Sequence, residues 1–395
     1  MSPYWAEAWA YGGIPRVVGA QARGLAARGM AVTVATTDAR DAESRLSPPE
    51  GVDGRRPWEQ TTEDGVRVRV FPNRSNALAF RKQLFLPRGF AQFVDEAARS
   101  FQIAHLHGCH NVPGALAARA LRRAGVPWVV QPNGTAGRIE RRRAAKMAFD
   151  LSLGRSVVRD ASRLIAVSEI ERWQLSASGG GEQRISLVPN PVDSDEVTPA
   201  PDGAAFRTGL GLGEGPLIVY LGQLSPRKRV DLAVRALAAL PGPARLIVAG
   251  PDMGVEGSLR RLVRRLGLGE RVLFLGVLVG RERLDALAGA DAVVYPSRDE
   301  IFGLVPLEAL LSGTPVVVSG DSGCGEVIHA TGGGVVVPYG DVEALAKGMA
   351  RTALQPEAWR ERVARAADRV RRWYGVPSVS ERLERIYRQV IAERG

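Results

Sequence analysis

The sequence predicts an α/β protein made of two doubly wound domains, each with a parallel β-sheet between layers of helices. Short apolar runs rich in β-branched residues alternate with longer amphipathic segments, and this alternation occurs twice along the chain. A polar stretch rich in Pro, Ala and Gly, residues 194–204, separates the two halves. Because strand–helix alternation is typical of parallel sheets, each half is predicted to be one domain.

The first domain is predicted to span residues 1–195. Residues 15–29 and 113–124 are rich in Ala and Arg and have the apolar spacing of amphipathic helices. The expected strands are 31–36, 66–71, 103–107, 128–131, 163–167 and 185–188.

The second domain is predicted to span residues 205–375. Ligands of doubly wound sheets bind at the carboxyl ends of the strands, so the cleft between the two domains is the expected site. The expected strands are 217–221, 245–249, 271–275, 291–295, 315–319 and 334–337.

Composition narrows the class of protein. The chain has 395 residues, of which 45% are hydrophobic and 24% charged, as in ordinary globular proteins. No apolar run reaches the roughly 18 residues of a membrane-spanning helix. Cys109 and Cys324 lie far apart in the sequence and have no metal-site spacing, which favours a reduced, cytoplasmic protein. The net charge of +11 favours anionic partners such as nucleotides, phosphates, acidic lipid surfaces or nucleic acid.

The strongest motif lies after the strand 291–295, where Glu300 and Glu308 flank Phe302 and Gly303. We expect a loop over 296–303 and then a helix from about Leu304 to Leu311, ending at Gly313. A helix N-terminus after a glycine exposes N–H groups that suit a phosphate. Glu308, about one turn into the helix, is placed to accept hydrogen bonds from vicinal sugar hydroxyls.

A second motif is the basic turn after the strand 217–221. Gly222 allows a tight exit from the strand and Pro226 shapes the turn. Arg227 and Lys228 then offer cations to a diphosphate at the end of the sheet. The alternative to a diphosphate site is that these residues form an ordinary exposed basic turn.

Two further motifs lie in the first domain. Gly12 and Gly13 precede a long helix, where a backbone without side chains allows close approach of an anionic ligand. His105 and His107 lie on the same face at the end of one strand. The alternative to a ligand contact is therefore that one of them is a histidine packed in the core. Asn133 follows the next strand, and His107 and Asn133 are both candidates for contact with a ligand.

Together these motifs resemble the retaining GT-B glycosyltransferases of family 4 (glycosyl transferases group 1), over nearly the whole chain. The resemblance implies that residues 376–395 form a helix that returns to the first, acceptor-side domain, and that the second domain binds the donor, a nucleotide-diphosphate sugar. It is carried by the Gly-Gly loop, His-x-His-Gly at 105–108, Val167-Ser168 with Glu171, Val188-Pro-Asn190-Pro-Val192-Asp193, the turn from Gly222 to Lys228, the Glu300–Glu308 motif and Gly323-Cys-Gly-Glu326.

The resemblance also implies roles for single residues. Glu308 would hold the ribose, and Glu300 the transferred sugar, together with the backbone near Phe302, Gly303 and Leu304. Lys228 and Arg227 would offset charge on the leaving diphosphate, which Gly12 and Gly13 would cover. The implied catalytic residues are Glu300, Lys228 and His107, and those on the sugar and acceptor side are Asn133, His107 and Glu300. No metal and no cofactor is implied, because cations and helix N-termini take the place of a divalent ion.

Three departures from the family pattern stand out. Gln223 replaces an arginine that usually follows the glycine at 222, and Asn133 replaces a histidine. The third departure is at the start, where the loop-like segment 3–13 has no apolar strand before it. Because a parallel sheet without a central strand would lose ladder hydrogen bonds, we expect the native start roughly ten residues upstream.

Residues 138–153 form a basic amphipathic segment. The sequence allows two interpretations: peripheral contact with an acidic membrane surface, on the inner face of the cytoplasmic membrane, or a solvated helix face.

The predicted function is transfer of a sugar, with retention, from a nucleotide-diphosphate sugar to a saccharide or lipid-linked saccharide acceptor. The resemblance implies a role in bacterial surface polysaccharide biosynthesis. Alternatives are a degenerate GT-B protein that binds a nucleotide sugar or a membrane without turnover, and a nucleotide-sugar epimerase or hydrolase of the same fold. Nucleic-acid binding is not expected, because no recognisable module accompanies the positive charge.

Overall fold

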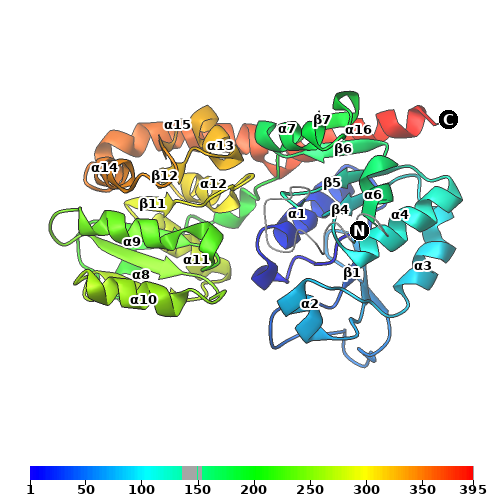
Figure 1. The fold of residues 1–395 in the computed structure, drawn as a ribbon, viewed down its shortest axis with the longest axis horizontal. Helices are drawn as coiled ribbons and strands as arrows, with labels where there is room; N and C mark the ends of the chain where they lie inside the picture. The colour runs from blue at the N-terminus through cyan, green and yellow to red at the C-terminus, as the bar shows by residue number, and fades with distance from the viewer. Residues whose placement is uncertain (136–148, 150–153, 395) are drawn as a thin grey trace. The chain divides into compact units, whose positions relative to one another are not determined.

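The computed structural model describes residues 1–135, 149 and 154–394, which form two compact units. Unit 1 comprises Met1–Pro191 and Val376–Gly395, and unit 2 comprises Val192–Gly375. Each unit is α/β with parallel strands and helices on the sheet faces (Figure 1), which confirms the predicted class of two doubly wound, Rossmann-like domains. No helix in the described part of the chain has the length and hydropathy needed to cross a bilayer.

Unit 2 contains one six-stranded sheet in which every pair is parallel, in the order β10-β9-β8-β11-β12-β13. The strand order reverses between β8 and β11, so ligands are expected at the carboxyl ends of these two strands. The strands are β8 (Leu217–Leu221), β9 (Arg245–Ala249), β10 (Val272–Gly276), β11 (Ala292–Tyr295), β12 (Val316–Ser319) and β13 (Gly334–Val337).

The helices of unit 2 begin inside the predicted linker. Asp195–Val197 forms a 3-10 turn, and α8 starts at Gly203, where the Asp202 carboxylate accepts from the Ala205 N–H. The helices are α8 (Gly203–Gly209), α9 (Val230–Ala238), α10 (Glu256–Arg265), α11 (Gly280–Ala288), α12 (Leu304–Leu311), α13 (Gly323–Thr331), α14 (Val342–Ala353) and α15 (Pro356–Tyr374).

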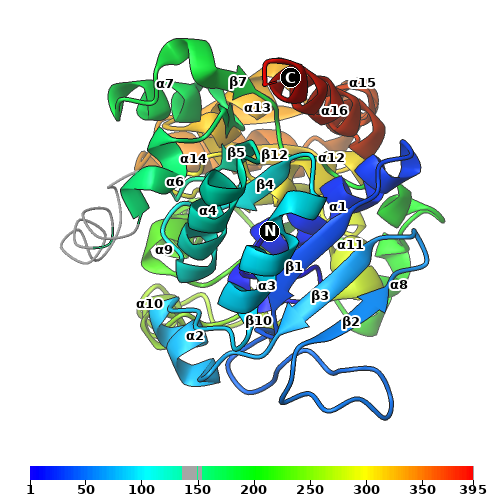
Figure 2. The ribbon, with the colours of Figure 1, turned by 90° about the vertical axis from the view of Figure 1, so that its right-hand side faces the viewer.

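Unit 1 contains two sheets, a parallel one in the order β4-β5-β6-β7 and a three-stranded one in the order β1-β3-β2. Figure 2 shows β1, β3 and β2 side by side. The edge strand β2 was not expected: its sequence, WEQT, is half exposed and has no apolar run, and it pairs antiparallel with β3. The strands are β1 (Thr33–Thr37), β2 (Trp58–Thr61), β3 (Arg67–Phe71), β4 (Ala104–His107), β5 (Trp128–Gln131), β6 (Arg163–Ala166) and β7 (Ile185–Leu187).

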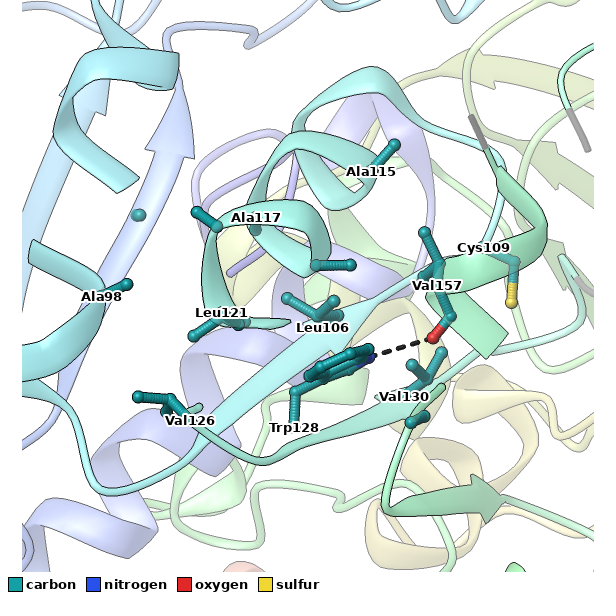
Figure 3. Packing of buried hydrophobic residues seen from close by; sticks show 14 of the residues in the cluster. Ala98, Leu106, Cys109, Ala115, Ala117, Leu121, Val126, Trp128, Val130 and Val157 are labelled. Atoms are coloured by element: carbon teal, nitrogen blue, oxygen red, sulfur yellow. Dashed lines mark hydrogen bonds between the residues drawn. The ribbon is translucent and has the colours of Figure 1, made fainter. Parts of the chain in front are cut away.

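The core of unit 1 packs helices against β4 and β5. Trp128 is fully buried, and its indole N–H donates to the Val157 carbonyl at 3.0 Å, while Leu106 and Leu121 lie close by (Figure 3). The helices of this unit are α1 (Ile14–Ala27), α2 (Asn76–Lys82), α3 (Phe90–Ala97), α4 (Val112–Ala124), α6 (Arg155–Arg159), α7 (Glu169–Ala177) and α16 (Val376–Ala392).

The last helix, α16, buries its apolar face in unit 1. Val379, Leu383 and Tyr387 form one core cluster with Val129 and Ile165 of the central strands. The chain therefore leaves unit 1 after β7 and returns to it at the C-terminal helix.

Candidate functional site

The basic turn after β8 and the acidic loop after β11 meet at the carboxyl end of the unit 2 sheet. Lys228 ends a short 3-10 turn, Pro226–Lys228, and its ammonium forms an ion pair with the Glu300 carboxylate. Only 8% of the Lys228 side chain and 14% of the Glu300 side chain are exposed. The topology thus brings together two charges that lie 72 residues apart in sequence.

Tyr295, the last residue of β11, contacts the Lys228 ammonium with both its hydroxyl and its ring. The Lys228 ammonium donates to the Tyr295 hydroxyl at 2.5 Å and lies 4.6 Å from the centre of its ring. The Tyr295 ring stacks on Tyr220 of β8, with centroids 6.2 Å apart. Sequence reasoning did not select Tyr295, because a tyrosine at the end of a buried strand is equally compatible with core packing.

The electrostatics keep the Glu300 carboxylate ionised, whereas burial lowers the pKa of the Lys228 ammonium despite the neighbouring Glu300 charge. Burial alone would raise the pKa of the Glu300 carboxyl, but the charges of Lys228 and Arg227 outweigh it and hold this pKa below its usual value. An ionised carboxylate beside an ammonium can orient a sugar hydroxyl and at the same time position a cation for a phosphate.

Helix α12 starts, as expected, at Leu304, with Gly303 as its N-cap at a φ of +77°. A Cβ on Gly303 would lie 2.8 Å from the Cys324 Sγ, so only glycine fits here without displacement. The Cys324 N–H donates to the Glu300 carbonyl at 3.0 Å, which ties the start of α13 to the acidic loop. Two helix N-termini therefore adjoin the Lys228–Glu300 pair, a favourable setting for an anion.

Glu308 lies in α12 and is 3% exposed. Its carboxylate forms an ion pair with Arg283 of α11, and the Arg283 Nη2 lies 2.5 Å from an oxygen of Glu196. Sequence reasoning predicted a ribose contact for Glu308 but missed Arg283, because nothing in the spacing of α11 indicates that this arginine turns inward.

The remaining donor-side candidates surround these groups. Arg227 is half-buried, and its carbonyl accepts from the Arg298 N–H at 2.8 Å. The Gln223 carbonyl accepts from the Tyr220 hydroxyl at 2.9 Å. Phe302 is buried, with its ring 5.8 Å from that of Tyr374.

In unit 1, His107 lies at the carboxyl end of β4 and is buried. Its ring stacks on His105 at 4.2 Å, as expected for two residues on one strand face, and the His105 Nδ1 lies 2.5 Å from the Tyr387 hydroxyl. Burial, the neighbouring His105 and the Met1 amino group hold the pKa of His107 well below its usual value. His107 is therefore neutral and suited to hydrogen bonding.

Asn133 has a φ of +54° and lies beside His107, with its Nδ2 3.5 Å from the His107 Nδ1. The Gln131 Nε2 donates to the Asn133 Oδ1 at 3.1 Å and to the Asn190 Oδ1 at 2.7 Å. Gln21 of α1 in turn donates to Gln131 at 3.0 Å. Hydrogen bonds between amide side chains thus hold the Asn133 side chain in place. Gln21 belongs to this network, and sequence reasoning did not select it.

Glu171 accepts a hydrogen bond from the loop that follows β5, the loop that contains Asn133. Its carboxylate accepts from the Gly134 N–H at 2.5 Å and from the Val167 N–H at 2.9 Å. Burial raises the pKa of Glu171 to about 7 despite these two donors. The contact explains why an acid in the first turn of α7 is 1% exposed.

Gly12 and Gly13 precede α1 in unit 1, as expected: Gly12 has a φ of +92° and Gly13 is the N-cap.

Cys109 and Cys324 are buried thiols. The described residues contain no group of three or more His, Cys, Asp or Glu side chains placed to hold a metal ion. Apart from Phe149, the basic segment 138–153 lies outside the described residues.

Both halves of the chain match known families. Residues 12–191 match the family described as Glycosyl transferase 4-like domain, and residues 205–370 match Glycosyl transferases group 1. The chain is 37% identical over 191 residues to D-inositol 3-phosphate glycosyltransferase of Mycobacterium sp. strain KMS, a match that covers 47% of this chain and 43% of that enzyme. The match to the same enzyme of Saccharomonospora viridis is 32% over 249 residues and covers 60% of this chain and 57% of that enzyme. These matches span less than two thirds of the relatives' length.

Solved structures share the fold over nearly the whole chain. HepE of Anabaena in complex with UDP and glucose has a TM-score of 0.75 at 21% identity, covering 98% of this chain and 99% of that one. Sucrose-phosphate synthase from Thermosynechococcus elongatus also has a TM-score of 0.75, at 22% identity, covering 97% of this chain and 94% of that one. At these identities the likeness establishes the fold alone.

Proposed function

The chain belongs to the GT-B glycosyltransferases, and we propose that it transfers a sugar, with retention of configuration, from a nucleotide-diphosphate sugar to a saccharide or lipid-linked saccharide. The observation that carries this proposal is the buried Lys228–Glu300 ion pair at the point where the unit 2 strand order reverses. A cation and a carboxylate held there fit the two parts of such a donor, the diphosphate and the sugar. Assembly of a bacterial surface polysaccharide is the setting that we propose.

Each donor-side residue has a role in this proposal. The Glu308 carboxylate accepts hydrogen bonds from the ribose hydroxyls, and Arg283 orients it through the ion pair. The N-terminus of α12, the Lys228 ammonium and Arg227 stabilise negative charge on the diphosphate as it leaves. Glu300 holds a hydroxyl of the transferred sugar. The leaving phosphate takes the proton of the acceptor hydroxyl, so that no separate base is required.

The acceptor side is proposed to lie on unit 1. Neutral His107 and Asn133, fixed by the amide chain from Gln21, present hydrogen-bonding groups at the ends of β4 and β5. Such groups recognise uncharged hydroxyls of a sugar. Gly12 and Gly13, at the N-terminus of α1, are the proposed cover of the diphosphate.

A comparison of donors tests this function. The purified protein is mixed with UDP-, GDP- or ADP-sugars and simple saccharide acceptors, and the products are analysed by NMR for the anomeric configuration. We expect one donor to be consumed and the product to keep the donor's configuration, with turnover lost in Glu308→Gln and kept in Glu282→Gln, an exposed acid on α11. Inversion would contradict the proposed stereochemistry, and donor binding without turnover would favour the binding-only alternative.

A further inference from the structure

The carboxyl ends of β5 and β6 lie side by side in unit 1, because these two strands pair in parallel. A turn over residues 132–135 follows β5, and α7, which follows β6, carries Glu171 in its first turn. The Glu171 carboxylate therefore lies next to the turn that contains Asn133, one of the residues proposed for the acceptor side.

The backbone of the turn 132–135 is left-handed at both central residues. The Thr135 N–H donates to the Pro132 carbonyl at 3.1 Å, and φ is +54° at Asn133 and +81° at Gly134. Positive φ at both central positions is the mark of a type I′ turn, for which Asn-Gly is a preferred sequence. Because residues other than glycine rarely adopt this region, the conformation of Asn133 depends on contacts from its neighbours.

Two side chains bind the turn 132–135. The Thr135 hydroxyl accepts from the Cys109 N–H at 2.9 Å and donates to the Pro132 carbonyl at 2.6 Å. The Glu171 carboxylate accepts from the Gly134 N–H at 2.5 Å. The hydrogen bond that closes a β-turn joins its first and fourth residues and leaves the third N–H unused, so Glu171 supplies the partner of this N–H.

The second carboxylate oxygen of Glu171 accepts from the Val167 N–H, at the end of β6, at 2.9 Å. The two oxygens thus join the turn after β5 to the end of β6. Glu171 is 1% exposed, so little water competes for either hydrogen bond. A carboxylate suits this position because both neighbours are donors, whereas an amide side chain would accept from one N–H and present its own NH₂ to the other.

The turn determines which groups Asn133 offers to a ligand. Its Oδ1 accepts from the Gln131 Nε2 at 3.1 Å. Its Nδ2 lies 3.4 Å from the Gln131 carbonyl and 3.5 Å from the His107 Nδ1, which are long distances for hydrogen bonds. The amide hydrogens of Asn133 can therefore donate to an oxygen atom of a ligand.

We propose that Glu171 is a positioning residue for the acceptor: it fixes the turn 132–135 so that the Asn133 amide donates to a hydroxyl oxygen of the acceptor sugar. The inference rests on the proposed function, since it takes the acceptor to be a saccharide. Because Glu171 is buried, it acts through the Gly134 backbone and does not touch the substrate. The alternative is that Glu171 only stabilises the start of α7, where its N–H donates to the Ser168 Oγ at 3.3 Å.

Two variants separate these roles. Glu171→Gln keeps the shape of the side chain but accepts only one of the two hydrogen bonds. Ser168→Ala removes the N-cap of α7 and keeps the Glu171 carboxylate. With methyl α-glucoside or methyl α-mannoside as acceptor, we expect Glu171→Gln to raise the acceptor KM about tenfold and to change kcat and the donor KM less than about twofold. Ser168→Ala should lower the Tm and leave the acceptor KM unchanged.

A double-mutant cycle tests whether Glu171 acts through Asn133. Asn133→Ala should itself raise the acceptor KM about tenfold, and adding Glu171→Gln should then change it less than about twofold. NMR gives a readout that needs no turnover. The Gly134 amide proton should move upfield in Glu171→Gln, which weakens its charge-assisted hydrogen bond, and should stay in place in Ser168→Ala.

The inference is wrong if the effects of Glu171→Gln and Asn133→Ala on the acceptor KM multiply, or if Ser168→Ala raises this KM as much as Glu171→Gln does. It is also wrong if the Gly134 amide signal stays in place in Glu171→Gln. Absence of sugar transfer by the parent protein is a different result, which contradicts the proposed function. The Gly134 signal then decides whether Glu171 holds the turn.

Discussion

The Arg283 guanidinium and the Glu308 carboxylate form a buried ion pair between α11 and α12, 25 residues apart in sequence. Arg283 also contacts Glu196, which precedes α8, so one arginine links the proposed ribose carboxylate to the segment that enters unit 2. Because Glu308 is 3% exposed, little water can solvate its carboxylate, and the ion pair with Arg283 offsets part of the cost of burying it.

Replacing Arg283 with alanine should therefore weaken both the fold of unit 2 and nucleotide binding. Removing the guanidinium from the buried Glu308 carboxylate is expected to lower the free energy of unfolding by about 3 kcal/mol. Thermal denaturation measures this loss, and titration with the donor nucleotide measures binding. Arg264→Ala, an exposed arginine on α10, is the control. Equal stability of the two variants would show that Arg283 contributes nothing through Glu308.

The Lys228 ammonium is proposed to stabilise charge that develops on the leaving diphosphate. Lys228→Ala should reduce kcat by about a hundredfold to a thousandfold, as removal of one electrostatic stabiliser does in other enzymes. Lys347→Ala is a matched control, because Lys347 is 74% exposed on α14. Steady-state assays with the accepted donor give the comparison. Less than a threefold change in kcat would remove Lys228 from the catalytic residues.

Parts of this site could be predicted from the sequence and parts could not, for physical reasons. Helix α12 was predicted to the residue because its signals are local: Gly303 before it, an apolar run within it and Gly313 after it. The inward turn of Arg283 depends on packing between two helices, which no local pattern encodes. The edge strand β2 escaped prediction because its stability comes from pairing with β3 rather than from apolar periodicity.

The neighbours of β1 and β4 in unit 1 could not be predicted from the sequence either. Alternation along the chain predicted β1 and β4, but it carries no information on which strands become neighbours. The contacts of Met1 with β4 and of Ser2 with β1 show that the first residues of the chain lie between these two strands.

Gly303→Ala should destabilise unit 2 because the new Cβ meets Cys324 and because φ is +77°. The two effects together are expected to lower the free energy of unfolding by about 2 to 4 kcal/mol. Gly313→Ala is the matched control, since Gly313 has a φ of +88° and nothing within 4 Å of its added Cβ. It should lose only the conformational part, about 1 kcal/mol.

A double variant separates the two effects of Gly303→Ala. Adding Cys324→Ala removes the Sγ that the new Cβ would meet at 2.8 Å, so part of the lost stability should return. Denaturant unfolding of the four proteins gives the coupling. Strict additivity would mean that the Cys324 contact does not constrain Gly303.

Glu171 should make the stability of unit 1 depend on pH. Its pKa is raised from 4.5 to about 7 by burial, so the folded state binds more protons than the unfolded state between these values. The stability that it contributes is complete below pH 4.5 and is lost as the pH rises to about 7. Across this window the free energy of unfolding should fall by about 3 kcal/mol, since one pKa unit corresponds to about 1.4 kcal/mol.

The buried histidines oppose this trend and must be separated from it. His105 has its pKa lowered to about 3, so the unfolded state takes up protons first and stability falls as the pH drops below about 6.5. The variant Glu171→Gln keeps both histidines and removes only the carboxyl titration. We therefore expect the difference in Tm between Glu171→Gln and the parent to change steadily in favour of the variant from pH 4.5 to 7. A difference that is constant over this range would show that Glu171 is already ionised in the folded protein at pH 4.5, held so by the Gly134 and Val167 N–H groups.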